Sequence, residues 1–193
     1  MTLLRLFSAL LLIGTLAACG GEEELAAKPP PVEPTAEATG HFCGMNLKDH
    51  EGPKGQIHLS GIPFPVWFTS VRDTIAFTML PEESKAVAAI YVNDMGRVSN
   101  WGQPEAGLWI DATEAYYVIG SDRAGGMGAA EAVPFGDIAS AETFQNRHGG
   151  RVVSFKGMPR DYILGDASGN PVAASSSAVK NSHGGKGSGH VTH

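Results

Sequence analysis

Two stretches of the sequence decide the fold: residues 65–92, PVWFTSVRDTIAFTMLPEESKAVAAIYV, and residues 132–155, AVPFGDIASAETFQNRHGGRVVSF. Each opens on a short aromatic segment that contains proline, continues with apolar residues at helical spacing, and ends in a run typical of a β-strand. The phenylalanine pair Phe68 and Phe77 recurs with the same spacing as Phe135 and Phe144. The two stretches are therefore predicted to be copies of one structural unit, the alternative being a chance match of two apolar patterns.

The first copy is predicted to carry one helix between strands. Strand candidates lie at residues 56–59 and 86–92. Ser70, followed three residues later by Asp73, is a candidate capping box at the start of the helix. The apolar stripe of that helix is expected to hold Phe68, Val71, Ile75, Ala76 and Met79.

The second copy repeats this order. Strand candidates at residues 115–119 and 151–155 flank a helix with Ile138, Ala141 and Phe144 on its apolar face. Each copy then has the order strand, strand, helix, strand. The sequence predicts an α+β fold of two similar small ββαβ units, at residues 41–108 and 109–172.

The composition favours a folded domain and excludes several classes of protein. The chain has 193 residues, of which 42% are hydrophobic and 18% charged, which is too apolar for general disorder. Its net charge of −6 argues against a nucleic-acid partner, which needs a basic face. The 25 glycines and 12 prolines indicate many turns rather than a long helical bundle.

The N-terminus has the features of a bacterial lipoprotein signal. Arg5 precedes an apolar run at residues 6–16, and small residues then lead to Cys19. Residues 1–18 are predicted to be the signal peptide and Cys19 the lipidated first residue, the alternative being an ordinary signal peptide with a chance cysteine. No run reaches the roughly 20 apolar residues of a membrane span. Because Gly20 follows in place of aspartate, we expect a lipid anchor in the outer membrane that faces the periplasm.

Both ends of the mature chain have compositions typical of unpacked segments. Residues 19–40 contain a run of glutamates and a cluster of prolines, so they are predicted to be a tether. Residues 173–193 are rich in Gly, Ser and His and are predicted to be a flexible tail. The tail histidines, a second candidate metal signal, include His183, His190 and His193.

The motif Cys43-Gly44-Met45 is the main candidate for chemistry. Exported proteins are found in oxidising compartments, where thiols form disulfides. Once lipid occupies Cys19, however, Cys43 has no cysteine partner in its own chain. A thiolate and a thioether two residues apart can face one point, because Gly44 lets the backbone bend. Soft sulfur ligands select Cu(I) over harder divalent ions. An intermolecular disulfide and a reactive thiol remain the alternatives.

Met127 is the second candidate ligand. It lies among glycines in Gly125-Gly126-Met127-Gly128, where a methionine that only fills a core is unusual. Met79 is expected in the core, whereas Met95 and Met158 lie in predicted turns and could serve either purpose. Nitrogen ligands could come from three histidines in the predicted folded part: His50, His58 and His148.

Enzyme signatures are missing from the sequence. It contains no Gly-x-Ser-x-Gly, no P-loop, no dinucleotide fingerprint and no His-Glu-x-x-His motif. Gly120-Ser121-Asp122 offers a serine, but the sequence places no base beside it. We therefore expect a protein that is not an enzyme.

Taken together, several segments resemble the NosL family, the copper-binding accessory lipoproteins of nitrous-oxide reductase in denitrification. The resemblance spans about residues 41–158. It rests, after Cys19, on Cys43-Gly44-Met45, Gly52-Pro53-Lys54-Gly55-Gln56-Ile57, Tyr91-Val92-Asn93-Asp94-Met95-Gly96, and Gly125-Gly126-Met127-Gly128 with Pro134-Phe135. It implies a fold like that of organomercurial lyase and Cu(I) bound through the Cys-x-Met sulfurs.

The resemblance also implies a copper chaperone that delivers Cu(I) to the apoprotein of nitrous-oxide reductase. Cys43 and Met45 match the family motif, and Met127 matches its Met-Gly segment. Some members have a histidine two residues after that methionine, where this chain has Ala129, so His50 is considered as a substitute ligand. A homodimer in which two chains share one metal is a further possibility that the sequence leaves open. The alternatives are a thiol enzyme that uses Cys43 on this scaffold and a surface lipoprotein with only a scaffolding role.

Overall fold

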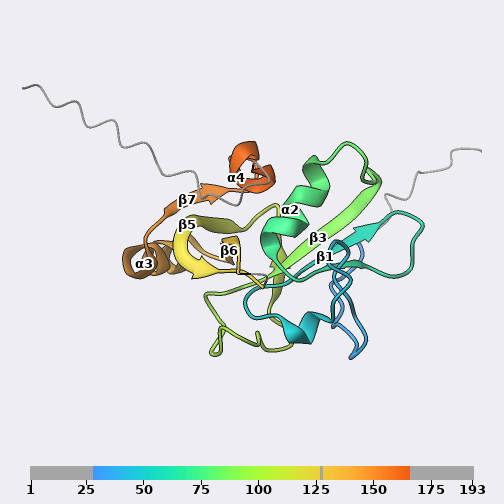
Figure 1. The fold of residues 1–193 in the computed structure, drawn as a ribbon, viewed down its shortest axis with the longest axis horizontal. Coiled ribbons are helices and arrows are strands. Elements are labelled where there is room, and N and C mark those ends of the chain that lie inside the picture. The colour runs from blue at the N-terminus through green and yellow to red at the C-terminus, as the bar shows by residue number, and fades with distance from the viewer. Residues whose placement is uncertain (1–27, 127, 166–193) are drawn as a thin grey trace, which may run out of the picture.

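The computed structural model describes residues 28–126 and 128–165. Within them the chain forms two small antiparallel sheets that lie side by side (Figure 1). The expected signal peptide, Cys19, Met127 and the expected tail at residues 173–193 lie outside the described residues. None of the described helices is both long and apolar enough to cross a bilayer.

The first unit has the predicted ββαβ order. It consists of β1 (Gly55–Leu59), β2 (Val66–Phe68), α2 (Val71–Met79) and β3 (Val87–Asn93). β1 is the middle strand of these three, since Ile57 pairs with Val66 on one side and with Ile90 on the other. The predicted helix start is confirmed, because the Ser70 side chain accepts a hydrogen bond from the backbone N–H of Asp73.

The second unit repeats the first in detail. It consists of β5 (Tyr116–Ala124), β6 (Ala130–Phe135), α3 (Ile138–His148) and β7 (Arg151–Ser154), and β5 lies in the middle of its sheet. Asp137 caps α3 as Ser70 caps α2, and the two caps have nearly the same backbone angles, φ −138° and −142°. The prediction of two similar ββαβ units is confirmed.

The second strand of each unit corrects one detail of the sequence reading. Phe68 was expected on the helical stripe but lies in β2, and Phe135 lies in β6. The extended Ser70 cap separates strand from helix, so Phe68 reaches the core from the sheet. There its ring contacts Phe77 of α2, with ring centres 5.6 Å apart, as Phe135 contacts Phe144 at 5.1 Å.

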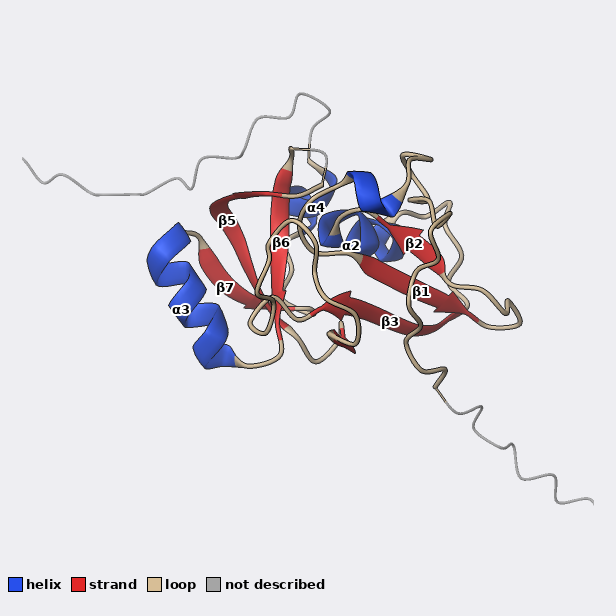
Figure 2. Ribbon diagram, turned by 90° about the horizontal axis from the view of Figure 1, so that it is seen from below, coloured by secondary structure: helices blue, strands red, loops and turns tan. Residues whose placement is uncertain are grey.

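The two units share one hydrophobic core. α2 packs against β6 of the second unit and against α4 (Arg160–Leu164), whereas α3 covers the outer side of the second sheet (Figure 2). The buried cluster joins Ile57 and Val92 of the first unit to Tyr117, Ile119 and Ala132 of the second. The strand β4 (Trp109–Asp111) pairs with β3, so residues expected to open the second unit extend the first sheet.

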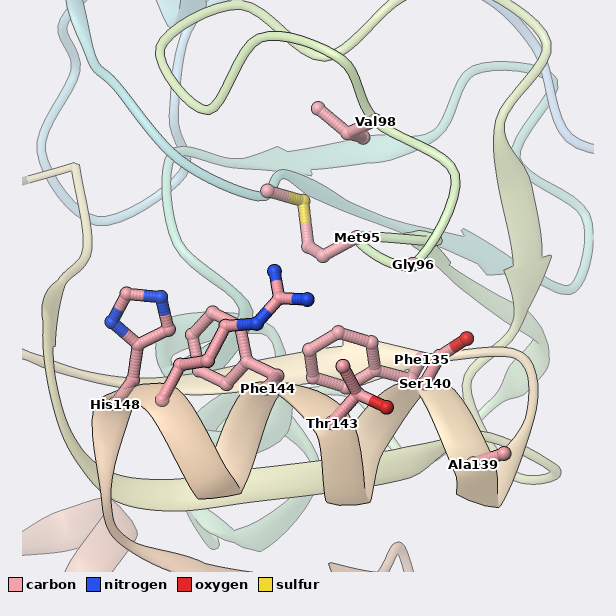
Figure 3. A pocket seen from close by; sticks show the side chains of 10 residues that line it. Met95, Gly96, Val98, Phe135, Ala139, Ser140, Thr143, Phe144 and His148 are labelled. Atoms are coloured by element: carbon pink, nitrogen blue, oxygen red, sulfur yellow. The ribbon is translucent and has the colours of Figure 1, made fainter.

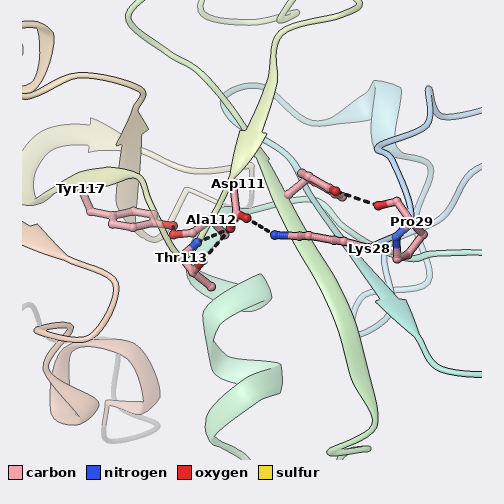
Figure 4. A network of polar contacts seen from close by, with 7 residues as sticks. Lys28, Pro29, Asp111, Ala112, Thr113 and Tyr117 are labelled. Atoms are coloured by element: carbon pink, nitrogen blue, oxygen red, sulfur yellow. Dashed lines mark hydrogen bonds and ion pairs between the residues drawn. The ribbon is translucent and has the colours of Figure 1, made fainter. Parts of the chain in front are cut away.

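Residues 28–40, expected to belong to the tether, lie against the first sheet. The Val32 N–H donates to the Gln56 side chain, which donates back to the Val32 carbonyl, at 3.0 and 2.9 Å. The Tyr91 hydroxyl donates to the Pro29 carbonyl, and Lys28 pairs with Asp111 (Figure 4). The packed part of the chain therefore already includes Lys28. The carbonyls of Pro29 and Val32 accept hydrogen bonds from polar side chains of the sheet.

Candidate functional site

Cys43 and Met45 lie on one tight loop. A bridge between Thr39 and Asn46 closes the loop, and the Gly40 N–H donates to the Met45 carbonyl at 2.9 Å. Gly44, at the turn between the two sulfur residues, has φ 65°, a conformation that favours glycine. Cys43 is half-buried and Met45 is 39% exposed. The loop thus carries a half-buried thiol and a more exposed thioether, two positions apart in the sequence.

The Cys43 sulfur packs closely against Thr69 and Gly40. Its Sγ lies 3.6 Å from the Thr69 hydroxyl and 4.0 Å from the Gly40 carbonyl oxygen. A Cβ atom at residue 40 would lie 2.8 Å from this sulfur and 2.9 Å from Thr69 Cγ2. Glycine at position 40 therefore makes the room in which the sulfur reaches Thr69.

Aromatic residues hold the loop on the core. The His41 N–H donates to the Trp67 carbonyl at 2.7 Å, which fastens the loop to β2. The His41 ring contacts Phe77 with ring centres 5.4 Å apart, and Phe42 contacts Phe68 at 5.7 Å. Because the loop is anchored to β2 and α2 immediately before Cys43, the position of the thiol is set by the first unit.

The turn at Gly125 and Gly126 approaches the same place from the second unit. It joins β5 to β6, and the Gly128 N–H donates to the Gly125 carbonyl at 2.9 Å. A Cβ atom on Gly126 would lie 2.5 Å from the Thr69 carbonyl oxygen and 2.8 Å from the His50 Cβ. Met127 itself lies outside the described residues. Its neighbour Gly126 nevertheless touches Thr69, the residue whose hydroxyl contacts Cys43.

His50 links this turn to the segment after Met45. Its Nδ1 lies 2.6 Å from the Gly126 carbonyl oxygen, and since a carbonyl only accepts, Nδ1 carries the proton. The side chain is 8% exposed, and its Nε2 has no hydrogen-bond partner among the described residues. The other two candidate histidines are hydrogen-bonded elsewhere, His58 to Gln56 and His148 to Asp122.

Two buried charged groups lie near the base of the turn. Glu131 of β6 accepts hydrogen bonds from the backbone N–H groups of Arg72 and Ala132, both at 2.8 Å, and burial raises its pKa to about 7. Lys54 donates to the Gly52 carbonyl, and burial lowers its pKa to about 8. Sequence reasoning assigned a role to neither residue, although Lys54 lies in a segment that carries the family resemblance. The signal for Glu131 is a charge in an otherwise apolar strand.

The other methionines in the described part of the chain are Met79, Met95 and Met158. Met158 is buried in the shared core, and Met79 packs against that core as expected. Met95 lines a pocket of about 430 Å³ between α3 and the chain after β3 (Figure 3). The same pocket is lined by Phe135, Phe144 and His148, and Cys43 is not part of it.

The described residues contain no group of three or more His, Cys, Asp and Glu side chains that could hold a metal ion. A metal at Cys43 would therefore rely on thioether sulfur as well as on the thiolate. Among the described residues, the polar contacts of the Cys43 sulfur are the Gly40 carbonyl and the Thr69 hydroxyl, and neither is a carboxylate.

Comparison with known proteins gives consistent matches. The NosL family model matches residues 31–163. The copper-binding lipoprotein NosL of Achromobacter cycloclastes is 46% identical over 164 residues, which cover 84% of each chain. The copper-binding lipoprotein NosL of Stutzerimonas stutzeri is 39% identical over 149 residues, covering 77% of this chain and 76% of that protein.

A solved structure supports the same assignment. The crystal structure of the copper chaperone NosL from Shewanella denitrificans superimposes with a TM-score of 0.62 at 30% sequence identity. The match covers 68% of this chain and 98% of the other. Sequence, fold and the length covered agree, and the chain belongs to the NosL family.

Proposed function

We propose that this protein is a copper chaperone that binds Cu(I) through the Cys43 thiolate and the Met45 thioether, with Met127 as a third sulfur ligand. The observation that carries the proposal is the closed loop that presents Cys43 and Met45 on either side of Gly44, at the surface of the first unit. Relatives at 46% and 39% identity bear the name copper-binding lipoprotein, and a structural relative bears the name copper chaperone.

The chemistry of the loop favours Cu(I). Thiolate and thioether are soft ligands, which suit Cu(I) better than hard divalent ions. Zinc sites usually take four Cys or His ligands, and the described residues offer no such cluster. Thioether sulfur binds without losing a proton, whereas Cys43 must release one when it binds copper.

The position of the Gly126 turn supports Met127 as the third ligand. Gly126 contacts Thr69 and His50, and Thr69 contacts the Cys43 sulfur. A ligand contributed by the second unit would let the two units enclose the ion from opposite sides. Three sulfur ligands at an exposed edge suit a carrier, because a partner can approach the ion from the open side.

We further propose that the carrier works at a membrane surface and delivers copper to the apoprotein of nitrous-oxide reductase. Cys19 would carry the lipid, and Lys28, nine positions later, pairs with Asp111 of the first sheet. The chain would face the periplasm from the outer membrane. The lipoprotein names of the relatives support membrane attachment.

Copper transfer tests this function. The full-length protein is loaded anaerobically with Cu(I) and mixed with copper-free nitrous-oxide reductase, and at set times the two proteins are separated and the copper in each is measured. We expect transfer that is faster than from a Cu(I) chelate of the same affinity. Transfer no faster than from that chelate would contradict a delivery role while leaving copper binding intact.

A further inference from the structure

If Cys43 binds copper as proposed, only one of the two atoms in the hydrogen bond between Thr69 and the Cys43 sulfur can be the donor. Thr69 comes directly after β2 and is 1% exposed. Its hydroxyl lies 3.6 Å from Cys43 Sγ, and either atom can donate while Cys43 is a thiol. A thiolate has no hydrogen, so once Cys43 is ionised only the Thr69 hydroxyl can donate.

We propose that Thr69 is a positioning residue of the copper site, whose hydroxyl donates a hydrogen bond to the Cys43 thiolate and so fixes the orientation of that sulfur. This inference rests on the proposed copper function. Hydrogen bonds to an ionised acceptor are roughly twice as strong as neutral ones. The contact therefore becomes a charge-assisted hydrogen bond when Cys43 binds copper as a thiolate, and it holds the sulfur beside Thr69.

The surroundings of Thr69 fit this role. Gly40 leaves just enough room for the sulfur beside Thr69, since a Cβ there would collide with both side chains. The backbone carbonyl of Thr69 faces Gly126, so one residue touches the Cys43 sulfur with its side chain and Gly126 of the second unit with its backbone. The hydroxyl has Cys43 as its hydrogen-bond partner among the described residues.

The test compares three variants of the full-length protein. Thr69→Val keeps the shape and removes the hydroxyl, Thr69→Ser keeps the hydroxyl and removes the methyl group, and Thr69→Ala removes both. Thr78→Val is the matched control, because that hydroxyl bonds to the Ile75 carbonyl within α2. Each protein is titrated anaerobically with Cu(I) against a competing chelator, and the near-ultraviolet thiolate-to-copper absorption band is recorded.

We expect Thr69→Val and Thr69→Ala to lose about tenfold or more in Cu(I) affinity and to shift the absorption band, as is typical when a hydrogen bond to a metal ligand is removed. Thr69→Ser and Thr78→Val should stay within about threefold with an unshifted band. The inference is overturned if Thr69→Val leaves affinity and band unchanged, or if Thr69→Ser loses as much as Thr69→Ala, which would assign the effect to packing.

A further variant separates this inference from the proposed function. If Cys43→Ser abolishes tight Cu(I) binding while Thr69→Val has no effect, the copper site stands and the role of Thr69 is wrong. If Cys43→Ser binds copper as the parent does, the proposed site itself is wrong. A change in band position cannot arise from a loss of folding stability alone, so the spectrum distinguishes positioning from a structural role.

Discussion

His50 Nδ1 lies 2.6 Å from the carbonyl oxygen of Gly126, and this hydrogen bond joins the two units beside the Cys43 loop. His50 ends the short 3₁₀ helix η1 (Leu47–Asp49), which begins two residues after Met45. Gly126 directly precedes Met127 in the turn of the second unit. The bond therefore connects the two segments that we propose to supply the copper ligands.

Gly126→Ala tests how closely the two segments must approach. The new Cβ would lie 2.5 Å from the Thr69 carbonyl oxygen, which is backbone and cannot rotate away, so the turn must move. We expect about 1–3 kcal/mol less stability, the usual cost of overpacking. We also expect about tenfold weaker Cu(I) binding, measured by chelator competition.

Gly102→Ala is the control for that variant. Its nearest contact would be 3.5 Å, an ordinary van der Waals distance, and its backbone does not need glycine. It should leave both stability and copper affinity unchanged. If Gly126→Ala also binds copper normally, the approach of the turn to Thr69 plays no part in the site.

Met127→Leu tests the third ligand. The substitution nearly conserves volume and removes the sulfur, a change that typically costs less than about 1.5 kcal/mol even in a core. The apo protein should therefore melt near the temperature of the parent, whereas Cu(I) binding should weaken and copper loss to a chelator should accelerate. Copper binding equal to that of the parent would confine the site to Cys43 and Met45.

Glu131→Gln tests the buried carboxyl group. Its pKa is about 7 in the folded protein against 4.5 for an ordinary glutamate, so between pH 4.5 and 7 the folded state holds a proton that the unfolded state has released. The free energy of unfolding should therefore fall as the pH rises through this range, by up to about 3 kcal/mol from this group, and level off above pH 7.

Urea unfolding of Glu131→Gln between pH 4.5 and 8 measures that contribution. Gln keeps an acceptor for the N–H groups of Arg72 and Ala132 and does not ionise. The stability difference between parent and variant should therefore change with pH, through Glu131 itself and through Lys54, whose pKa the Glu131 charge raises. Parallel pH profiles for the two proteins would show that Glu131 titrates near its ordinary pKa.

The repeated fold could be predicted because its signals are local. The paired phenylalanines, the helical apolar spacing and the Ser70 cap all follow from neighbouring residues. The second strand of each unit was harder to separate from the helix, because Val66–Phe68 is a short apolar run that joins the helical pattern. Residues 28–40 pack through backbone carbonyls and polar side chains, which composition alone does not reveal.

The candidate site also has a part that the sequence predicts from neighbouring residues and a part that it does not. Cys43-Gly44-Met45 could be predicted because its two sulfur residues are local to one loop. The contacts of Thr69 with Cys43, of His50 with Gly126, and of Glu131 with the start of α2 join residues that are distant in the sequence. They depend on how the second unit packs against the first, and no short motif encodes that packing.

The central claim is that the Cys43 thiolate holds the copper, and one measurement tests it most directly. Anaerobic Cu(I) titration of the full-length protein against a competing chelator is compared for the parent and Cys43→Ser, with circular dichroism to confirm that both fold. We predict that tight binding is lost in Cys43→Ser while the fold is retained. An affinity within about threefold of the parent, a free-energy change of roughly 0.7 kcal/mol, would contradict the account.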